Sequence, residues 1–260
     1  MKVVLFCGGL GMRIREYSEE VPKPMVPIGY RPILWHVMKY YAHFGHREFI
    51  LCLGYKADVI KRYFLNYDEC LSNDFTLSGA GNIELANSDI HDWKISFVDT
   101  GINTNIGGRL RAVRDYLGKD EYFLANYSDN LTDVPLPEMI KGFEGKGRVA
   151  SFLCVRPSQS FHTVSLDANN VVSGISHASH GNLRINGGYF VLRRDIFDYM
   201  QPGEELVEEP FQRLIEKQLL AAYRYDGFFV CMDTFKERQA LEEMYATGNA
   251  PWTMWERRRS

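Results

Sequence analysis

The chain has 260 residues, 45% of them hydrophobic, which is enough apolar material for the core of one large domain. Its 30 basic and 33 acidic residues give a formal net charge of −3, so nothing in the charge balance favours nucleic acid as a partner. No run of about 20 apolar residues occurs, so we predict no membrane-spanning segment and no membrane partner.

The first predicted element is a strand over 3–7 that ends in a glycine-rich loop. This loop contains Gly8, Gly9 and Gly11, followed by Arg13. Glycines permit a sharp turn and a close approach of backbone N–H groups to an anion, and the guanidinium of Arg13 can bind phosphate oxygens with two parallel hydrogen bonds. The pattern predicts a phosphate-binding loop, and a simple turn after a core strand is the alternative.

A lysine between two prolines follows this loop. Pro22 and Pro24 fix the backbone on both sides of Lys23, so the chain presents the ammonium group with little conformational freedom. We therefore predict that Lys23 contacts phosphate. A solvated lysine in a surface loop is the alternative.

Strands and helices then alternate. The apolar pattern predicts a helix over 32–41, a strand over 48–53, a helix over about 58–66 and a strand over 94–99. This alternation predicts an α/β fold with a doubly wound, mainly parallel sheet that binds ligands at the carboxyl ends of its strands. Residues 67–92 are polar and irregular, which indicates an insertion or a β-hairpin that caps the site or contacts a neighbouring subunit.

A helix is predicted over about 108–117, and Gly107, Gly108 and Arg109 lie where it begins. The first N–H groups of a helix have no partner within the helix. This segment is therefore a candidate second site for an anion or a stacked base.

Two further strands end in an aspartate. The strand over 122–126 leads to Asp129, and the strand over 228–232 leads to Asp233. Mg²⁺ prefers one or two carboxylates together with substrate phosphates, so the two acids are candidate metal ligands. Either one alone could instead cap a helix.

The cysteines indicate a reducing compartment. There are five, without a C-x-x-C pair, and Cys7, Cys52, Cys154 and Cys231 lie in apolar runs, whereas Cys70 has a more polar setting. We predict reduced thiols in a cytoplasmic protein, with Cys70 exposed.

These motifs resemble those of the sugar-phosphate nucleotidyltransferases. The glycine loop is similar to the family's G-G-x-G-T-R and residues 23–25 to its K-P-M, which together surround a nucleoside triphosphate. The segments around 98–110 (V-D-T-G…G-G-R-L) and 250–252 (A-P-W) look like those of the cytidylyltransferase branch, the glucose-1-phosphate cytidylyltransferases. The likeness covers nearly the whole chain.

The resemblance implies a fold and an activity. The fold is one nucleotidyltransferase domain over 1–260, with a Rossmann-like, GT-A-type mixed sheet and an acceptor-binding part at about 150–230. The activity is transfer of a cytidylyl group from CTP to a phosphorylated small-molecule acceptor, with release of pyrophosphate. The resemblance further implies Mg²⁺ as cofactor, glucose 1-phosphate as the default acceptor and a homo-oligomer.

The resemblance also implies roles for individual residues. It assigns catalysis to Arg13 and Lys23, and Mg²⁺ binding to Asp129 and Asp233. The nucleotide-binding residues that it implies are Cys7, Gly8, Gly9, Gly11, Met12, Arg13, Lys23, Gly107, Gly108, Arg109, Ser128 and Asp129. The acceptor-binding residues that it implies are Tyr127, Ser176, His177, Asn186, Gly187 and Gly188.

Three departures from the family pattern leave alternatives open. Met12 replaces a threonine whose hydroxyl meets a phosphate, and Ser128 replaces a glycine. The family's E-K-P is missing, and Ser176 and His177 take the places of its glutamate and lysine. A different acceptor, including a non-sugar phosphate, and a catalytically weak nucleotide-binding homologue are the alternatives. We do not predict a metal site at His177 and His180, because no cysteine or carboxylate lies near them in the sequence.

Overall fold

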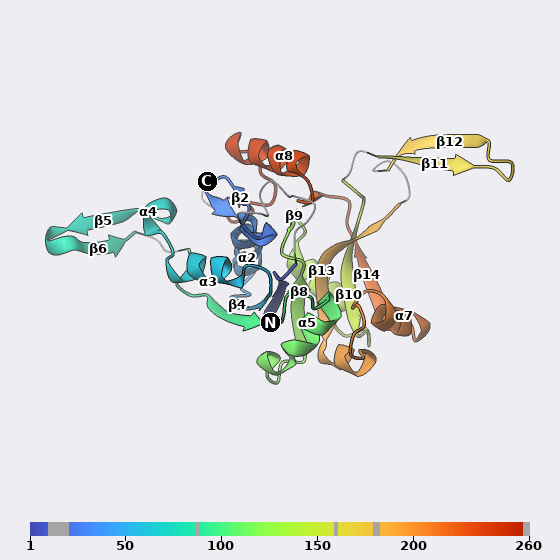
Figure 1. The fold of residues 1–260 in the computed structure, drawn as a ribbon, viewed down its shortest axis with the longest axis horizontal. Coiled ribbons are helices and arrows are strands. Elements are labelled where there is room, and N and C mark those ends of the chain that lie inside the picture. Colours follow the sequence, from blue (N-terminus) through green and yellow to red (C-terminus); the bar gives the residue numbers. More distant parts are fainter. Residues whose placement is uncertain (10–20, 87–88, 159–160, 179–182, 257–260) are drawn as a thin grey trace.

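The computed structural model describes residues 1–9, 21–86, 89–158, 161–178 and 183–256. A seven-stranded sheet with the order β14-β10-β13-β8-β1-β4-β7 forms its centre (Figure 1). Its strands are β1 (Val3–Phe6), β4 (Glu48–Leu53), β7 (Lys94–Asp99), β8 (Tyr122–Asn126), β10 (Ala150–Val155), β13 (Ile185–Arg193) and β14 (Leu220–Arg224). Strand β13 is antiparallel to both neighbours and the other adjacent pairs are parallel, which confirms the predicted mixed, mainly parallel sheet.

Helices cover both faces of this sheet. They are α2 (Ile33–His43), α3 (Ala57–Leu65), α4 (Glu69–Ser72), α5 (Ile106–Ala112), α6 (Leu136–Phe143), α7 (Glu209–Glu216) and α8 (Phe235–Ala246), with the 3₁₀ turns η2 (Lys23–Met25), η3 (Gly79–Gly81), η4 (Arg114–Leu117) and η5 (Arg194–Tyr199). Successive side chains of a strand point to opposite faces. Accordingly, Leu5 belongs to the core shared with α2, and Phe6 to the core shared with α5 and α7.

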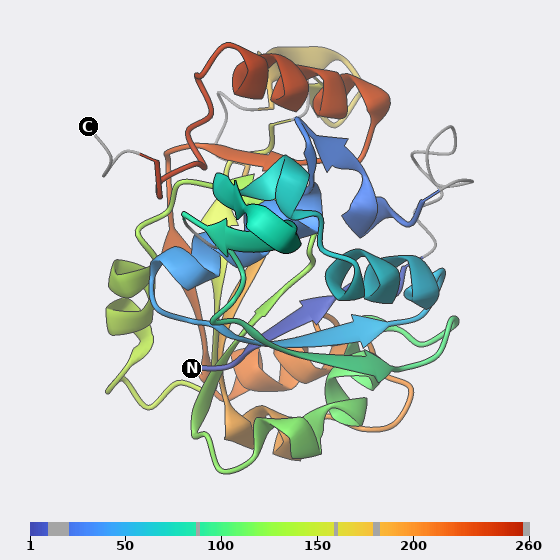
Figure 2. The same ribbon diagram turned by 90° about the vertical axis from the view of Figure 1, so that its left-hand side faces the viewer.

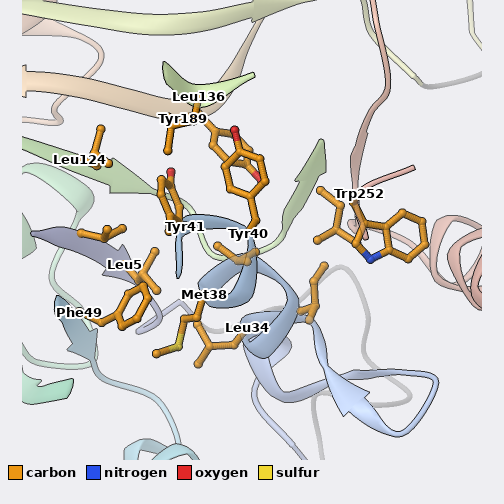
Figure 3. Close-up of a cluster of buried hydrophobic side chains, with 14 of the residues drawn as sticks. Leu5, Leu34, Met38, Tyr40, Tyr41, Phe49, Leu124, Leu136, Tyr189 and Trp252 are labelled. Atoms are coloured by element: carbon orange, nitrogen blue, oxygen red, sulfur yellow. The ribbon is translucent and has the colours of Figure 1, made fainter. Parts of the chain in front are cut away.

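Helix α2 forms the centre of the first core (Figure 3). Its Tyr40 and Tyr41 pack on Tyr189 of β13, with ring centroids 5.6 and 5.9 Å apart. Nearer the start of the helix, the indole N–H of Trp252 donates to His36 Nδ1 at 3.3 Å, and His36 Nε2 donates to the carbonyl of Ile28 at 3.1 Å. Trp252 thereby ties the end of the described chain to α2.

The predicted elements of the sheet occupy their predicted positions. The strands over 48–53, 94–99 and 122–126 are confirmed to the residue. The helix predicted to reach residue 117 instead ends at Ala112. The N–H of Val113 turns back to the carbonyl of Leu110, three residues earlier, and the chain continues as the 3₁₀ turn η4.

Two β-ribbons project from opposite ends of the long axis (Figure 1). One pairs β5 (Phe75–Ser78) with β6 (Asn82–Leu85), which confirms the hairpin alternative for 67–92. The other pairs β11 (His162–Leu166) with β12 (Val172–His177). Shorter pairs join β2 (Pro27–Ile28) to β3 (Arg31–Pro32), and β9 (Asn130–Thr132) to β15 (Phe229–Cys231).

The cysteines follow the sequence prediction in part. All five are free; Cys7 and Cys52 are buried and Cys70 is exposed, as predicted, whereas Cys154 and Cys231 are only half-buried. Within the described parts of the chain, no helix combines the length and hydrophobicity needed to cross a bilayer.

Candidate active site

A cavity of about 850 Å³ lies where several strands of the sheet end. Figure 2 shows β1, β4 and β7 side by side with their arrowheads at one edge, the edge at which open α/β sheets bind ligands. The volume is within the range of small-molecule sites. The lining includes Cys7 and Gly9 after β1, residues 102–106 after β7, residues 127–130 after β8, Asn186 of β13, Glu205, and Lys23, Cys231 and Asp233.

Lys23 joins the two predicted metal ligands. Its Nζ lies 2.5 Å from Asp129 Oδ2 and 2.6 Å from Asp233 Oδ1. Burial opposes the charge of Lys23, but the negative charge of Asp129, the electrostatic attraction of Cys231 and the hydrogen bonds to Asp129 and Asp233 together outweigh it, so the pKa of the lysine is raised above its ordinary value. The position between the two carboxylates is therefore already one that a cation occupies.

The residues at this position also fit a divalent metal. Asp129 Oδ1 is buried without a hydrogen-bond partner, so its lone pairs are available to a ligand. One ligand atom each of Asp129, Cys231 and Asp233 lies within 4.8 Å of the others. The two carboxylates could hold Mg²⁺, which prefers oxygen ligands.

Asp233 is not the cap of helix α8. Thr234 is the N-cap: its hydroxyl accepts a hydrogen bond from the N–H of Glu237, and the Glu237 carboxylate accepts from the N–H of Thr234. The alternative role considered for Asp233 is therefore wrong, and its side chain points to Lys23 instead.

Ser128 holds the turn that presents Asp129. Its φ of +67° lies in the left-handed region, which favours glycine, the residue usual in the family at this place. The Ser128 hydroxyl donates to the carbonyl of Phe6 at 2.8 Å, and its N–H donates to Asn126 Oδ1 at 2.6 Å. The hydroxyl bond ties the turn after β8 to the end of β1, and the N–H bond closes the turn on β8 itself.

Arg109 forms a structural bridge across the same edge. Only 2% of it is exposed, and its guanidinium donates to the carbonyls of Gly8, Leu53 and Ile102 and to the hydroxyl of Thr100. A Cβ on Gly8 would lie 1.9 Å from Arg109 Nη1, so only glycine allows this approach. Arg109 lines the cavity, but these four hydrogen bonds already fix its guanidinium.

The start of helix α5 is also occupied by side chains. Asn105 Oδ1 accepts from the N–H of Gly108 at 2.8 Å, and Glu205 Oε2 accepts from the N–H of Ile106 at 3.2 Å. Gly107 packs against the backbone of Glu204, whose carbonyl oxygen would be 2.2 Å from an added Cβ. In this structure protein atoms thus satisfy the N–H groups of Ile106 and Gly108 at the helix start.

The predicted acceptor residues fall into two groups. Tyr127 and Asn186 line the cavity, and the Asn186 amide donates to the Tyr127 hydroxyl at 3.4 Å. Ser176 and His177 lie on ribbon β11–β12, outside the residues that line the cavity. The Ser176 hydroxyl pairs with that of Thr163 at 2.9 Å.

The remaining predicted residues have the following places. Gly187 and Gly188 support the site from β13: Asn130 Nδ2 donates to the carbonyl of Gly187, and the N–H of Tyr127 donates to that of Gly188. Gly11, Met12, Arg13 and His180 lie outside the described residues. The functional roles of all these residues stay predictions.

Sequence reasoning missed several residues of the cavity lining, among them two with ionisable side chains, Cys231 and Glu205. Cys231 is two positions before Asp233, and the alternation of side chains along a strand could have placed both on one side. No pattern in the sequence marks Glu205, which reaches the cavity because its carboxylate caps α5.

Comparisons with known proteins agree with this geometry. The family described as nucleotidyl transferase matches residues 2–228. The probable glucose-1-phosphate cytidylyltransferase of Bacillus subtilis (strain 168) is 38% identical over 258 residues, covering 98% of this chain and 100% of that protein. The glucose-1-phosphate cytidylyltransferase of Salmonella typhi has the same identity and coverage.

A solved structure shares the fold. The UTP-bound UGPase from Acinetobacter baumannii superimposes with a TM-score of 0.70 at 17% identity, covering 99% of this chain and 97% of that one. A match over most of the chain, together with relatives 38% identical along their whole length, establishes the family. The chain belongs to the nucleotidyl transferase family.

Proposed function

We propose that this protein is a CTP-dependent nucleotidyltransferase that converts CTP and glucose 1-phosphate into CDP-glucose and pyrophosphate. The observation that carries the proposal is the pair of carboxylates, Asp129 and Asp233, that bind the ammonium of Lys23 within the cavity. We call the position of this ammonium the cation seat. The choice of CTP and glucose 1-phosphate is supported by the two relatives named as glucose-1-phosphate cytidylyltransferases.

The chemistry needs positioning and charge neutralisation more than acid–base catalysis. An oxygen of the acceptor phosphate, already anionic at neutral pH, bonds to the α-phosphorus of CTP while the bond from that phosphorus to the pyrophosphate oxygen breaks. The acceptor oxygen carries no proton, so no general base is needed. The predicted contributions of the protein are the loop N–H groups, Arg13 and Lys23.

Asp129 and Asp233 would hold Mg²⁺. When bound, the ion neutralises phosphate charge and orients the triphosphate. We propose that Lys23 then leaves the carboxylates and turns its ammonium to the phosphates that enter the cavity. Lys23 lines the same cavity, so its ammonium has only a short distance to move.

A second candidate is the same reaction on another phosphorylated acceptor. Its support is the missing E-K-P together with the place of Ser176 and His177 on a ribbon outside the cavity lining. An acceptor recognised through Tyr127 and Asn186 would not need those two residues.

One experiment tests both candidates. Pyrophosphate release is measured with Mg²⁺ over four nucleoside triphosphates and a panel of sugar and non-sugar phosphates. The proposed function predicts the highest kcat/KM for CTP with glucose 1-phosphate. A preference for another phosphate selects the second candidate, and no release with any pair refutes both.

We also propose that the protein is a cytoplasmic homo-oligomer. The free cysteines suit a reducing compartment. Ribbon β11–β12 exposes Val164, Leu166, Val172 and Ile175 by 52–66%, and an isolated two-stranded hairpin is only marginally stable in water. Contact with another subunit would cover such a ribbon. Light scattering after size exclusion should therefore give a mass above 30.0 kDa, and a monomer would contradict the proposal.

A further inference from the structure

Cys231 is held beside the two carboxylates by the backbone. Strand β15 pairs with β9 so that Cys231 lies opposite Asn130, and the N–H of Met232 donates to the carbonyl of Asp129 at 3.0 Å. Cys231 and Asp233 are two residues apart, and both line the cavity. The thiol is thus part of the cation seat by strand geometry rather than by a chance side-chain orientation.

The distances suit a single ion with three protein ligands. One ligand atom each of Asp129, Cys231 and Asp233 lies within 4.8 Å of the others. Tetrahedral bonds of about 2.3 Å to sulfur and about 2.1 Å to oxygen place ligand atoms roughly 3.5 Å apart. Bringing the three ligand atoms to this spacing therefore requires shifts of about 1 Å, which small rotations of the short side chains can supply.

Two further observations mark this point as a cation site. The ammonium of Lys23 lies 2.5 and 2.6 Å from the two carboxylates, only slightly farther than a metal would be. Asp129 Oδ1 is buried and has no hydrogen-bond partner, so an acceptor remains unused beside the cation. Lys23 satisfies the Oδ2 atom of Asp129 and leaves Oδ1 for another ligand.

We infer that Cys231 is a third protein ligand at this seat and makes it a binding site for a thiophilic divalent cation such as Zn²⁺, Cd²⁺ or Co²⁺. This inference rests on the proposed metal site of Asp129 and Asp233. Mg²⁺ takes oxygen ligands and gains nothing from a thiol, whereas sulfur favours softer metals. A softer ion bound by two carboxylates and a thiolate therefore competes with Mg²⁺.

The exchange balances without any redox step. The metal forms one bond to sulfur and one to each carboxylate, the thiol proton of Cys231 passes to solvent, and the ammonium of Lys23 leaves the seat. No electron is transferred, and reversal needs only a chelator and a proton.

The test uses Co²⁺ and Cd²⁺ as probes on the metal-stripped full chain. A Cys70→Ser background removes the exposed thiol as a competing ligand. Cys231→Ser and Cys231→Ala are compared in that background with Cys154→Ser, a matched substitution of the other half-buried cysteine, which lies away from the cavity lining. Co²⁺ titrations, with and without CTP, record the sulfur-to-cobalt charge-transfer absorption, and calorimetry gives Kd for Cd²⁺ and Mg²⁺.

We expect the charge-transfer band in the background protein and in Cys154→Ser, and its loss in both Cys231 variants. Cd²⁺ affinity should fall by at least about tenfold in the Cys231 variants. Loss of a residue that only supports a metal ligand already lowers affinity by about tenfold or more, and loss of a direct ligand should cost at least as much. Mg²⁺ affinity should change by less than about twofold. A band that survives both Cys231 variants, no band in the background protein, or equal Cd²⁺ affinity in all variants would overturn the inference.

Activity is measured separately so that the two proposals can fail independently. A protein that shows the sulfur-dependent Co²⁺ band but releases no pyrophosphate from CTP keeps the inference and loses the proposed function. A protein active with Mg²⁺ that lacks the band keeps the function and loses the inference. If both proposals hold, Cd²⁺ inhibits the Mg²⁺-dependent reaction of the background protein at concentrations about tenfold lower than those that inhibit Cys231→Ser.

Discussion

The edge of the central sheet and ribbon β11–β12 both carry residues predicted to bind substrate, but they hold them in opposite ways. At the sheet edge, Arg109 and Ser128 are almost fully buried, and hydrogen bonds to neighbouring strands and loops fix each of them. On the ribbon, Ser176 is exposed, and its side-chain hydrogen bond goes to Thr163, its cross-strand neighbour. Rigid elements thus position one part of the predicted site, whereas Ser176 in the other part is open to solvent.

The largest expected effect is at the two carboxylates of the sheet edge. Asp129→Asn and Asp233→Asn keep the size of the side chain but remove the charge that would hold Mg²⁺. We expect each to lower kcat by at least about a thousandfold, or about 4 kcal/mol of transition-state stabilisation. Steady-state kinetics with thermal unfolding measures activity and fold together.

The matched control is Asp226→Asn, an exposed acid in ion pairs away from the cavity. It should keep kcat within about twofold, because exposed ion pairs contribute little. Near wild-type activity of Asp129→Asn or Asp233→Asn would show that the corresponding acid does not hold the metal.

The next effect is on stability and concerns Arg109. Arg109→Ala removes four hydrogen bonds, to the carbonyls of Gly8, Leu53 and Ile102 and to the hydroxyl of Thr100, and each such bond contributes about 0.5–1.5 kcal/mol. We expect the free energy of unfolding in urea to fall by about 3 kcal/mol or more. Arg109→Lys should recover only part of it, because an ammonium lacks the planar fork.

Arg62→Ala is the control for this prediction, since the Arg62 side chain is 75% exposed and its ion pair is on the surface. Its effect should stay within about 0.5 kcal/mol. If Arg109→Ala is equally mild but weakens CTP binding, the arginine belongs to the nucleotide site rather than to the framework.

A smaller effect is expected on the pH dependence of stability, and it concerns His36, which is buried in the core around α2. Burial lowers the pKa of His36 to about 4, because its imidazole is enclosed and Nδ1 already accepts from Trp252. Between the unfolded value of about 6.5 and about 4, the unfolded state binds a proton that the folded state does not, so stability falls as pH falls. Across this window wild type should lose about 3 kcal/mol relative to His36→Gln.

Urea unfolding at several pH values measures this difference. Above pH 7 the gap between wild type and His36→Gln should be constant, because His36 is neutral in both states. A gap that does not change between pH 7 and 4 would mean that the folded protein accommodates the charged imidazole.

The smallest expected effect is on the ribbon, at the predicted acceptor residue Ser176. From its place outside the cavity lining, we expect Ser176→Ala to change the KM for the acceptor by less than about twofold. Loss of a neutral hydrogen bond to substrate would cost about 0.5–1.5 kcal/mol, which is two- to tenfold. An increase of about tenfold would support the predicted acceptor role of Ser176.

Sequence patterns located what depends on local periodicity and on strand ends. The strand over 122–126 and the aspartate beyond it could be placed because buried parallel strands are apolar runs and their carboxyl ends face the ligand. The hydrogen-bond partners of the side chains could not be predicted in this way. The acceptors of Arg109 come from loops that are far apart in the sequence, so its role in the framework depends on tertiary contacts.

The ribbon residues show a second limit. Ser176 and His177 are assigned to the acceptor site by their positions in the sequence, which do not give the path of the chain between β12 and β13. Cys231 shows the reverse case: the alternation that would have placed it beside Asp233 was present, but the apolar run around it favoured a buried core thiol.

The ammonium of Lys23 between Asp129 and Asp233 implies a thermodynamic linkage between metal and nucleotide. Without CTP, an incoming ion replaces a counter-ion that the protein already supplies, so Mg²⁺ alone should raise the melting temperature only slightly. The phosphates of CTP offer the displaced ammonium of Lys23 a new partner, which removes part of the free-energy cost of moving it away from the carboxylates. Each ligand should therefore tighten the binding of the other by the same factor, so that the enzyme acquires its metal mainly together with its nucleotide.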